Sequence, residues 1–314
     1  MRQKDNDIQR LRNRIGELEQ AAAAITQEEL CELLDVLPNH PDFDLQYLIG
    51  RTDPDLPEAD IALGVTLQDT FQHWKGEDTS AALFIEGGLP LSSRRVSSLC
   101  VVSTFLIGSL KDSKRATAIY FFCGHHDKPS DPIGGPPGMI RSLIIQILRL
   151  FAVNLDFITP RLRPLLEKLN LRALCDCFSK LVTQLPASTV LFCIVDGISF
   201  FEKTEWIDDT NKAIGDLRDL VYDSDTGAVF KLLVTSPTRS RCVADIFEPE
   251  NRLSLLSDSR RQQATERDRA MARRRPPGRA PRFARPASQD ASTQGTNQSM
   301  QVDEYDSFSD VDEL

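Results

Sequence analysis

The segment Leu191-Phe192-Cys193-Ile194-Val195-Asp196 consists of five apolar residues followed by a carboxylate. An apolar run that does not alternate with polar residues is typical of a strand buried between two layers of helices in a parallel sheet. Three comparable runs occur elsewhere in the chain, and a short fifth strand could lie at residues 252–256. The predicted strands therefore span residues 81–85, 116–123, 189–195, 229–235 and 252–256.

The segments between these runs are long enough for crossover helices. Residues 138–151 carry the clearest helical pattern, with apolar side chains at spacings of three and four. Similar patterns predict helices over residues 96–110, 171–185 and 205–221. Strands that alternate with helices indicate an α/β fold, here a parallel sheet of about five strands sandwiched by helices.

The N-terminal residues 1–37 are predicted to be helical. Apolar residues at alternating spacings of three and four form the seam of a short coiled coil: Ile8, Leu11, Ile15, Leu18, Ala22 and Ile25. This helix could mediate self-association, or it could pack on its own core. Thr26-Gln27-Glu28-Glu29 then forms a capping box that starts a second helix, which Pro38 ends.

Two composition changes predict the domain boundaries. Residues 38–64 are rich in proline and aspartate, which favours a linker. The α/β domain follows over residues 65–256. Residues 257–314 are Arg-rich and then acidic, a pattern typical of a disordered tail.

The charge and the cysteines bound the class of protein. A net charge of -9 argues against nucleic-acid binding by the whole molecule. The basic segment 260–285 could instead contact nucleic acid or act as a nuclear-import signal, although a solvated linker is the simpler interpretation. No apolar stretch reaches the length of a membrane helix, and the seven cysteines form an odd set without a disulfide pattern. We therefore expect a cytoplasmic protein, with the nucleus as the alternative, and no membrane association.

The loop after the first predicted strand is where a phosphate-binding loop would lie. Such a loop needs glycines to expose backbone amides, a lysine for the phosphates, and a hydroxyl for magnesium. The candidate nucleotide-binding residues in this loop are Gly87, Gly88, Ser92, Ser93, Arg94 and Arg95. No register places a lysine correctly, and Arg94 falls in the lysine slot if Gly88 starts the motif. A structural strand-to-helix turn is the alternative.

Residues that follow the later strands complete the candidate site. Asp196 could hold magnesium through water, or it could cap a helix. Glu202 is the nearest acid that could activate a water molecule. Thr235 and Arg239 could sense a phosphate, although helix capping and solvent exposure would explain them equally well.

Cys123-Gly124-His125-His126-Asp127 gathers potential metal ligands within five residues. Structural zinc sites draw their ligand pairs from separated segments. The sequence shows no second pair at a suitable spacing, so we do not expect a metal here.

Four segments, taken in order, resemble fungal NACHT-like members of the STAND P-loop NTPases over roughly residues 65–256. The turn Asp196-Gly197-Ile198-Ser199 and the strand end Thr235-Ser236-Pro237-Thr238-Arg239 are the most specific of the matching residues. The matching segments are Leu83-Phe84-Ile85-Glu86-Gly87, Ala118-Ile119-Tyr120-Phe121-Phe122-Cys123-Gly124-His125-His126, Phe192-Cys193-Ile194-Val195-Asp196-Gly197-Ile198-Ser199-Phe200-Phe201-Glu202 and Lys231-Leu232-Leu233-Val234-Thr235-Ser236-Pro237-Thr238-Arg239-Ser240-Arg241.

The resemblance implies a P-loop NTPase-like core with a Walker A slot at residues 87–95, a Walker B aspartate at Asp196 and a sensor-like strand end at residues 235–239. The chain departs from an active NTPase because its loop lacks Gly-Lys-Ser/Thr, and because Ser199 and Phe200 stand where NACHT proteins tend to carry acids. We therefore expect a protein-interaction or signalling scaffold that does not hydrolyse nucleotide and needs no cofactor. The alternative is an ATP- or GTP-dependent switch that binds Mg²⁺ and uses Arg94 or Arg95 in place of the lysine.

Overall fold

The computed structural model describes residues 25–52, 57–88 and 96–255, together with residues 6, 9, 10 and 14. Its centre is a parallel sheet with the strand order β2-β3-β4-β1-β5. All five predicted strands are confirmed, each within two residues of its expected ends. They are β1 (Ala81–Glu86), β2 (Ala116–Phe122), β3 (Val190–Asp196), β4 (Val229–Ser236) and β5 (Arg252–Ser254).

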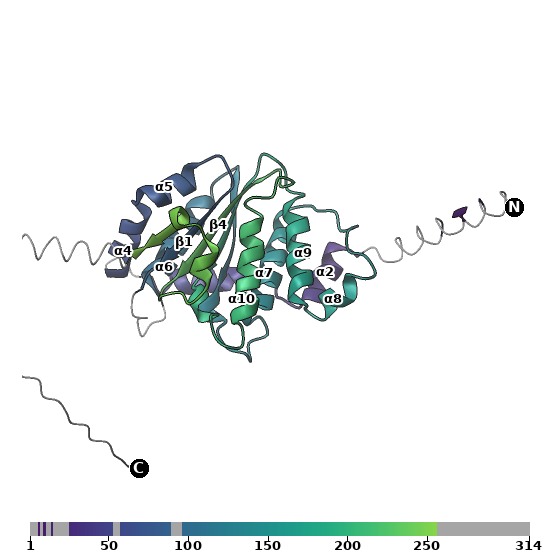
Figure 1. Ribbon diagram of the computed structural model, residues 1–314, viewed down its shortest axis with the longest axis horizontal. Coiled ribbons are helices and arrows are strands. Elements are labelled where there is room, and N and C mark those ends of the chain that lie inside the picture. Colours follow the sequence, from purple (N-terminus) through teal and green to yellow (C-terminus); the bar gives the residue numbers. More distant parts are fainter. Residues whose placement is uncertain are drawn as a thin grey trace, which may run out of the picture. The chain divides into compact units, whose positions relative to one another are not determined.

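Helices cover both faces of this sheet (Figure 1). The chain runs from β1 to the far strand β2 and then steps back through β3 and β4. Right-handed crossovers place helices on opposite faces when the chain reverses its direction along a sheet. One face accordingly carries α3 (His40–Ile49), α4 (Pro57–Thr66), α5 (Asp69–Gly76) and α6 (Ser98–Leu110). The other carries α2 (Gln27–Leu34), α7 (Gly135–Leu150), α8 (Arg163–Glu167), α9 (Leu171–Val182) and α10 (Ile207–Asp219).

Four short 3-10 turns complete the described elements. They are η1 (Cys123–His125), η2 (Ile198–Phe200), η3 (Val243–Ile246) and η4 (Pro249–Asn251). The helices predicted from the apolar patterns correspond to α6, α7, α9 and α10. The architecture is that of a P-loop NTPase-like α/β fold.

Strand β3 shows why the apolar runs predict the sheet so well. Phe192 and Ile194 pack into the core beneath α6, whereas Leu191, Cys193 and Val195 pack into the core beneath α7 and α9. Successive side chains of a strand point to opposite faces. A central strand is therefore largely apolar, because both of its faces are buried.

The prediction of a linker over residues 38–64 is wrong in its secondary structure, because α3 and most of α4 lie there. Two of the prolines that suggested a linker stand at helix starts. Pro41 occupies the first turn of α3, and Pro57 is the first residue of α4. Proline is favoured at these positions because the first amides of a helix have no intrahelical partner. Leu45 and Leu48 of α3 are buried in the core beside α6.

Helix α2 begins at the predicted capping box. The Thr26 hydroxyl accepts a hydrogen bond from the Glu29 amide, and the Glu29 carboxylate accepts one from the Thr26 amide, both at 3.1 Å. The helix ends at Leu34, because Asp35 adopts a left-handed conformation with φ of 49°. Arg141 of α7 then donates a 2.8 Å hydrogen bond to the Leu34 carbonyl. Helix α2 is thereby tied to the α/β core.

Two predicted regions lie outside the described residues. The tail, residues 257–314, is one of them. The N-terminal coiled-coil seam is the other, apart from Ile25 at its end. Four residues between or before the seam positions, Asn6, Gln9, Arg10 and Arg14, are described and are helical.

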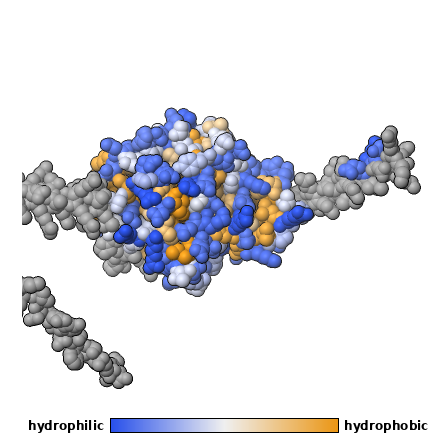
Figure 2. Space-filling view, viewed as in Figure 1, coloured by the Kyte–Doolittle hydropathy of each residue, from blue (hydrophilic) through white to orange (hydrophobic). Residues whose placement is uncertain are grey.

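The described surface is largely polar, as Figure 2 shows for one face, with apolar side chains gathered over α2, α8 and α9. All seven cysteines are free. In the described part of the chain, no helix combines the length and the apolar character that crossing a bilayer requires.

Candidate functional site

The carboxyl ends of the parallel strands form the edge at which ligands bind in open α/β sheets. Strands β3, β4 and β1 are neighbours in the sheet and end in Asp196, Ser236 and Glu86. The fold therefore brings together the three loops that the sequence singled out. The polar atoms at this edge are largely engaged with one another.

Asp196 is the centre of a buried hydrogen-bond network. Its Oδ1 accepts a 2.9 Å hydrogen bond from the Ser103 hydroxyl of α6 and a 2.8 Å bond from the Thr235 hydroxyl of β4. The Thr235 hydroxyl in turn accepts a hydrogen bond from the Gly197 amide. Burial raises the pKa of the Asp196 carboxyl, although the hydroxyl hydrogen bonds oppose this effect. The surroundings of Asp196 therefore disfavour the charged form that a magnesium ligand needs.

Gly87 and Gly88 start the loop after β1. A side chain at Gly87 would place its Cβ 2.9 Å from the Pro237 carbonyl oxygen, so only glycine fits between the ends of β1 and β4. Gly88 has a φ of +57°, a conformation that glycine adopts without strain. The remaining candidate residues of this loop, Ser92, Ser93, Arg94 and Arg95, lie outside the described residues.

Glu202, the acid nearest to Asp196 in the sequence that was considered for activating water, binds backbone amides in the structure. Its carboxylate accepts hydrogen bonds from the amides of Arg241, Cys242 and Val243 and from the Ser240 hydroxyl. Burial alone would raise the pKa of Glu202, but these hydrogen bonds outweigh it and hold the pKa below its ordinary value. A carboxylate that is stabilised in this way is a poor base.

The side chain of Arg239 is exposed. It lines a shallow polar hollow together with Ser199, Lys203, Thr238 and Arg241. Of the predicted sensor residues, the fold thus brings Thr235 to Asp196 and leaves Arg239 at the surface.

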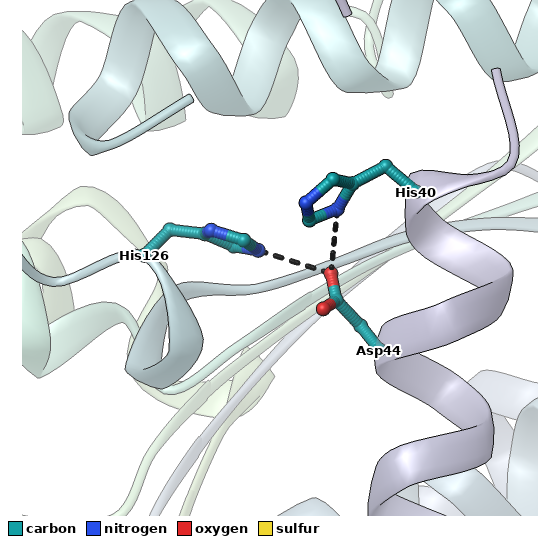
Figure 3. Close-up of side chains that lie close together, drawn as sticks. All are labelled: His40, Asp44 and His126. Carbon is teal, nitrogen blue, oxygen red and sulfur yellow. Dashed lines mark hydrogen bonds and ion pairs between the residues drawn. The ribbon is translucent and has the colours of Figure 1, made fainter. Parts of the chain in front are cut away.

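A second polar cluster lies where α3 meets the turn after β2 (Figure 3). His40 and Asp44 are one helical turn apart on α3, and His126 approaches them from the end of η1. Asp44 Oδ2 lies 3.3 Å from His40 Nδ1 and 3.0 Å from His126 Nε2. These three atoms all lie within 4.8 Å of one another, an arrangement that could hold a metal ion.

The surroundings orient this cluster. The Nδ1 atom of His126 lies 2.9 Å from Asp131 Oδ2, and Asp44 Oδ1 lies 3.5 Å from His125 Nδ1. Burial alone would raise the pKa of Asp44, but its hydrogen bonds to His125 and His126 hold the pKa well below its usual range. For His126, burial acts to lower the pKa, and the hydrogen bonds to Asp44 and Asp131 raise it overall.

The sequence had offered one half of this cluster. The Cys123–Asp127 segment supplies His126 to this cluster, and the other two side chains, His40 and Asp44, come from the separate segment α3. The available signal was a histidine and an acid four residues apart, a spacing that places both on one face of a helix. The two residues were not expected to share a helix, because residues 38–64 are predicted to be a linker. Ser103 was also missed, since nothing local marks a serine within an apolar helix.

Comparisons with curated proteins and with solved structures gave no match. A model of the nephrocystin 3 N-terminal family, in contrast, matches residues 65–236. The match runs from the end of α4 to the last residue of β4 and includes Gly87, Asp196 and Thr235. Because it covers more than half of the 314 residues, the chain belongs to the nephrocystin 3 N-terminal family.

Proposed function

We propose that this protein is a non-hydrolysing NTPase-like module that acts as a protein-interaction or signalling scaffold. The observation that carries the proposal is the pair of hydroxyl groups on Asp196 Oδ1, from Ser103 and Thr235. In an active site, a carboxylate at this position would hold magnesium through water. Here the same oxygen is shared by two protein hydroxyls, and the residue is only 6% exposed.

Two further features support the scaffold. The segment from Gly87 to Arg95 contains no lysine to hold the terminal phosphates. Gly87, which could have cradled a phosphate, is required by its contact with Pro237 instead. The resemblance to NACHT-like STAND proteins is consistent with a scaffold because switch cores of this kind act through protein contacts.

The apolar surface over α8 and α9 favours a protein partner. Leu165 is 45% exposed, and it lines a hollow with the partly buried Phe157 and Leu162. Lys180 and Asp176 border the same hollow. An apolar centre with a charged border is common at protein interfaces. Self-association through the N-terminal helix is a second contact that we propose, because its sequence carries a coiled-coil seam.

Titration of the full chain with a fluorescent ATP or GTP analogue and Mg²⁺ tests the proposal. We expect no saturable binding up to millimolar nucleotide. Saturable micromolar binding that is lost in Asp196→Ala would contradict the scaffold and favour the alternative switch. In that case Arg94→Ala and Arg95→Ala would identify the arginine that replaces the lysine.

Mass determination by light scattering tests the self-association. A full chain that is dimeric, and becomes monomeric when Leu11 and Leu18 are replaced by Asp, is the expected outcome. A monomer at all concentrations would remove the N-terminal helix as a contact.

A further inference from the structure

The cluster of His40, Asp44 and His126 lies outside the hydrogen-bond network of Asp196 and plays no part in the proposed function. Three of the four histidines of the chain, His40, His125 and His126, gather around one carboxylate. The fourth, His73, lies on α5 and pairs with Glu77. Three imidazoles around a single carboxylate exceed what an ordinary ion pair needs.

One imidazole nitrogen of His40 and one of His126 face the same carboxylate oxygen, Asp44 Oδ2. His126 faces carboxylates through both ring nitrogens, Nδ1 toward Asp131 Oδ2 and Nε2 toward Asp44 Oδ2. A metal ion would take the place of the proton on Nε2, and Nδ1 would go on donating to Asp131. His40 Nδ1 is buried and has no aligned hydrogen-bond partner among the described residues, although it lies 3.3 Å from the same oxygen. Three potential ligand atoms therefore converge on one point.

We propose that His40 Nδ1, Asp44 Oδ2 and His126 Nε2 bind one divalent transition-metal ion, with Zn²⁺ favoured by this set of ligands. Two imidazole nitrogens and one carboxylate oxygen suit zinc better than magnesium or calcium, which prefer all-oxygen sites.

The ligand spacing supports this assignment. Bonds of about 2.0–2.1 Å in a tetrahedron place neighbouring ligand atoms about 3.3–3.4 Å apart. The two distances from Asp44 Oδ2, 3.3 Å and 3.0 Å, are close to that value. The third side of the triangle, between the two imidazole nitrogens, lies within 4.8 Å. The His40 side chain is 30% exposed, so this ring has room to move and an ion can enter beside it.

The second layer of contacts is of the kind that metal sites use. Asp131 fixes the His126 ring, in the manner of the carboxylate that orients many zinc-bound histidines. Asp131 is itself held, because its Oδ1 accepts a 3.0 Å hydrogen bond from the Ile133 amide. His125 approaches the other oxygen of Asp44 and leaves Oδ2 to the metal.

Such an ion would join two parts of the chain. His40 and Asp44 lie on α3, before the region that the family model matches, whereas His126 lies within it. Three protein ligands leave a fourth position for water or for a group from a partner. The bound metal would fasten α3 to the carboxyl end of β2.

The test uses the full chain, freed of metal with a chelator and kept reduced. Zn²⁺ is titrated by calorimetry and by competition with a chromophoric chelator. We expect one ion per chain and a higher melting temperature, since a ligand that binds only the folded state stabilises it. His40→Gln and Asp44→Asn should each weaken binding at least tenfold.

His73→Gln is the matched control, because His73 and Glu77 have the same four-residue spacing on a helix without the third ligand. It should bind Zn²⁺ like the wild type. The His40 variant is the decisive one, since His40 is partly exposed and its loss should leave the fold intact by circular dichroism. Equal affinity in His40→Gln and the wild type would overturn the proposal, as would the absence of binding to the wild type.

Cobalt provides an independent readout. Co²⁺ in this site should give the visible absorption of a nitrogen- and oxygen-bound tetrahedral centre, and His40→Gln should remove it. A sulfur-to-metal charge-transfer band would assign the ion to a cysteine and reject the site.

Discussion

The hydroxyl of Ser103 on α6 donates a 2.9 Å hydrogen bond to the carboxylate of Asp196 at the end of β3, across 93 residues of sequence. Thr235 donates to the same oxygen from β4. The network therefore joins the helix that follows β1 to the ends of two neighbouring strands. Internal hydrogen bonds thus hold the Asp196 carboxylate at the carboxyl edge of the sheet.

Replacement of Asp196 tests whether this network is structural. Asp196→Ala leaves the buried Thr235 hydroxyl without its acceptor, whereas the Ser103 hydroxyl keeps the Leu99 carbonyl at 3.1 Å. We expect a loss of about 1–3 kcal/mol in the free energy of unfolding. Asp196→Asn keeps the accepting oxygen and should cost less than about 1 kcal/mol at pH 7. Urea denaturation measures both. Equal losses in the two variants would show that the charge, rather than the acceptor, is required.

The stability difference between Asp196→Asn and the wild type should depend on pH. The folded-state pKa of Asp196 is raised. This group therefore stabilises the fold most below its unfolded pKa of about 3.9, and the contribution is lost as the pH rises through the folded pKa. Asp196→Asn should gain stability relative to the wild type between pH 4 and pH 7. A constant difference over this range would contradict the raised pKa.

Glu202 should show the opposite pH dependence. Its folded pKa is lowered, so its contribution is present above the unfolded pKa of about 4.3 and is lost as the pH falls through the folded value. Glu202→Gln should cost about 1.5–3 kcal/mol at pH 7, because it replaces a charged acceptor of several amide hydrogen bonds. Urea denaturation should show a smaller cost at pH 3. The exposed Glu205 provides the control Glu205→Gln, for which we expect no change.

Lys231 of β4 is fully buried and donates a 2.7 Å hydrogen bond from Nζ to the Trp74 carbonyl. The carbonyl belongs to the last turn of α5, where a cation is favourable. Lys231→Met should cost about 1–3 kcal/mol, because the carbonyl loses its partner.

Two measurements check this prediction. Urea denaturation gives the stability, and the tryptophan emission, to which Trp74 and Trp206 both contribute, should shift to the red as α5 loosens. Lys212→Met, which removes an exposed pair with Asp216, should change the stability by about 0.5 kcal/mol or less. A more stable Lys231→Met protein would show that burial of the ammonium group costs more than its hydrogen bond contributes.

A pair of glycine replacements tests whether packing requires Gly87. Gly87→Ala would press a methyl group against the Pro237 carbonyl and should cost about 1–3 kcal/mol. Gly108→Ala on α6 meets open space and should stabilise the helix by up to about 1 kcal/mol. Thermal unfolding compares the two. A Gly87→Ala protein of unchanged stability would contradict the packing role.

Much of the fold could be predicted because its signals are local. Four apolar runs identified β1 to β4, since a strand that is covered by helices on both faces is largely apolar. The short edge strand β5 was predicted from residues 252–256. The capping box at Thr26 was equally local, because its two hydrogen bonds join residues three positions apart. The linker prediction for residues 38–64 was wrong because proline is common both in linkers and in the first turn of a helix, where Pro41 and Pro57 lie.

The sequence by itself determined the parallel α/β architecture and the position of Asp196 at the end of a strand. It also determined that no lysine stands in the loop after β1. Only the tertiary structure decided what these residues contact: Asp196 with Ser103, Glu202 with the amides of Arg241–Val243, and Asp44 with His126. The physical reason is that side-chain periodicity repeats within a few residues, whereas these contacts join segments that only the folded sheet brings together.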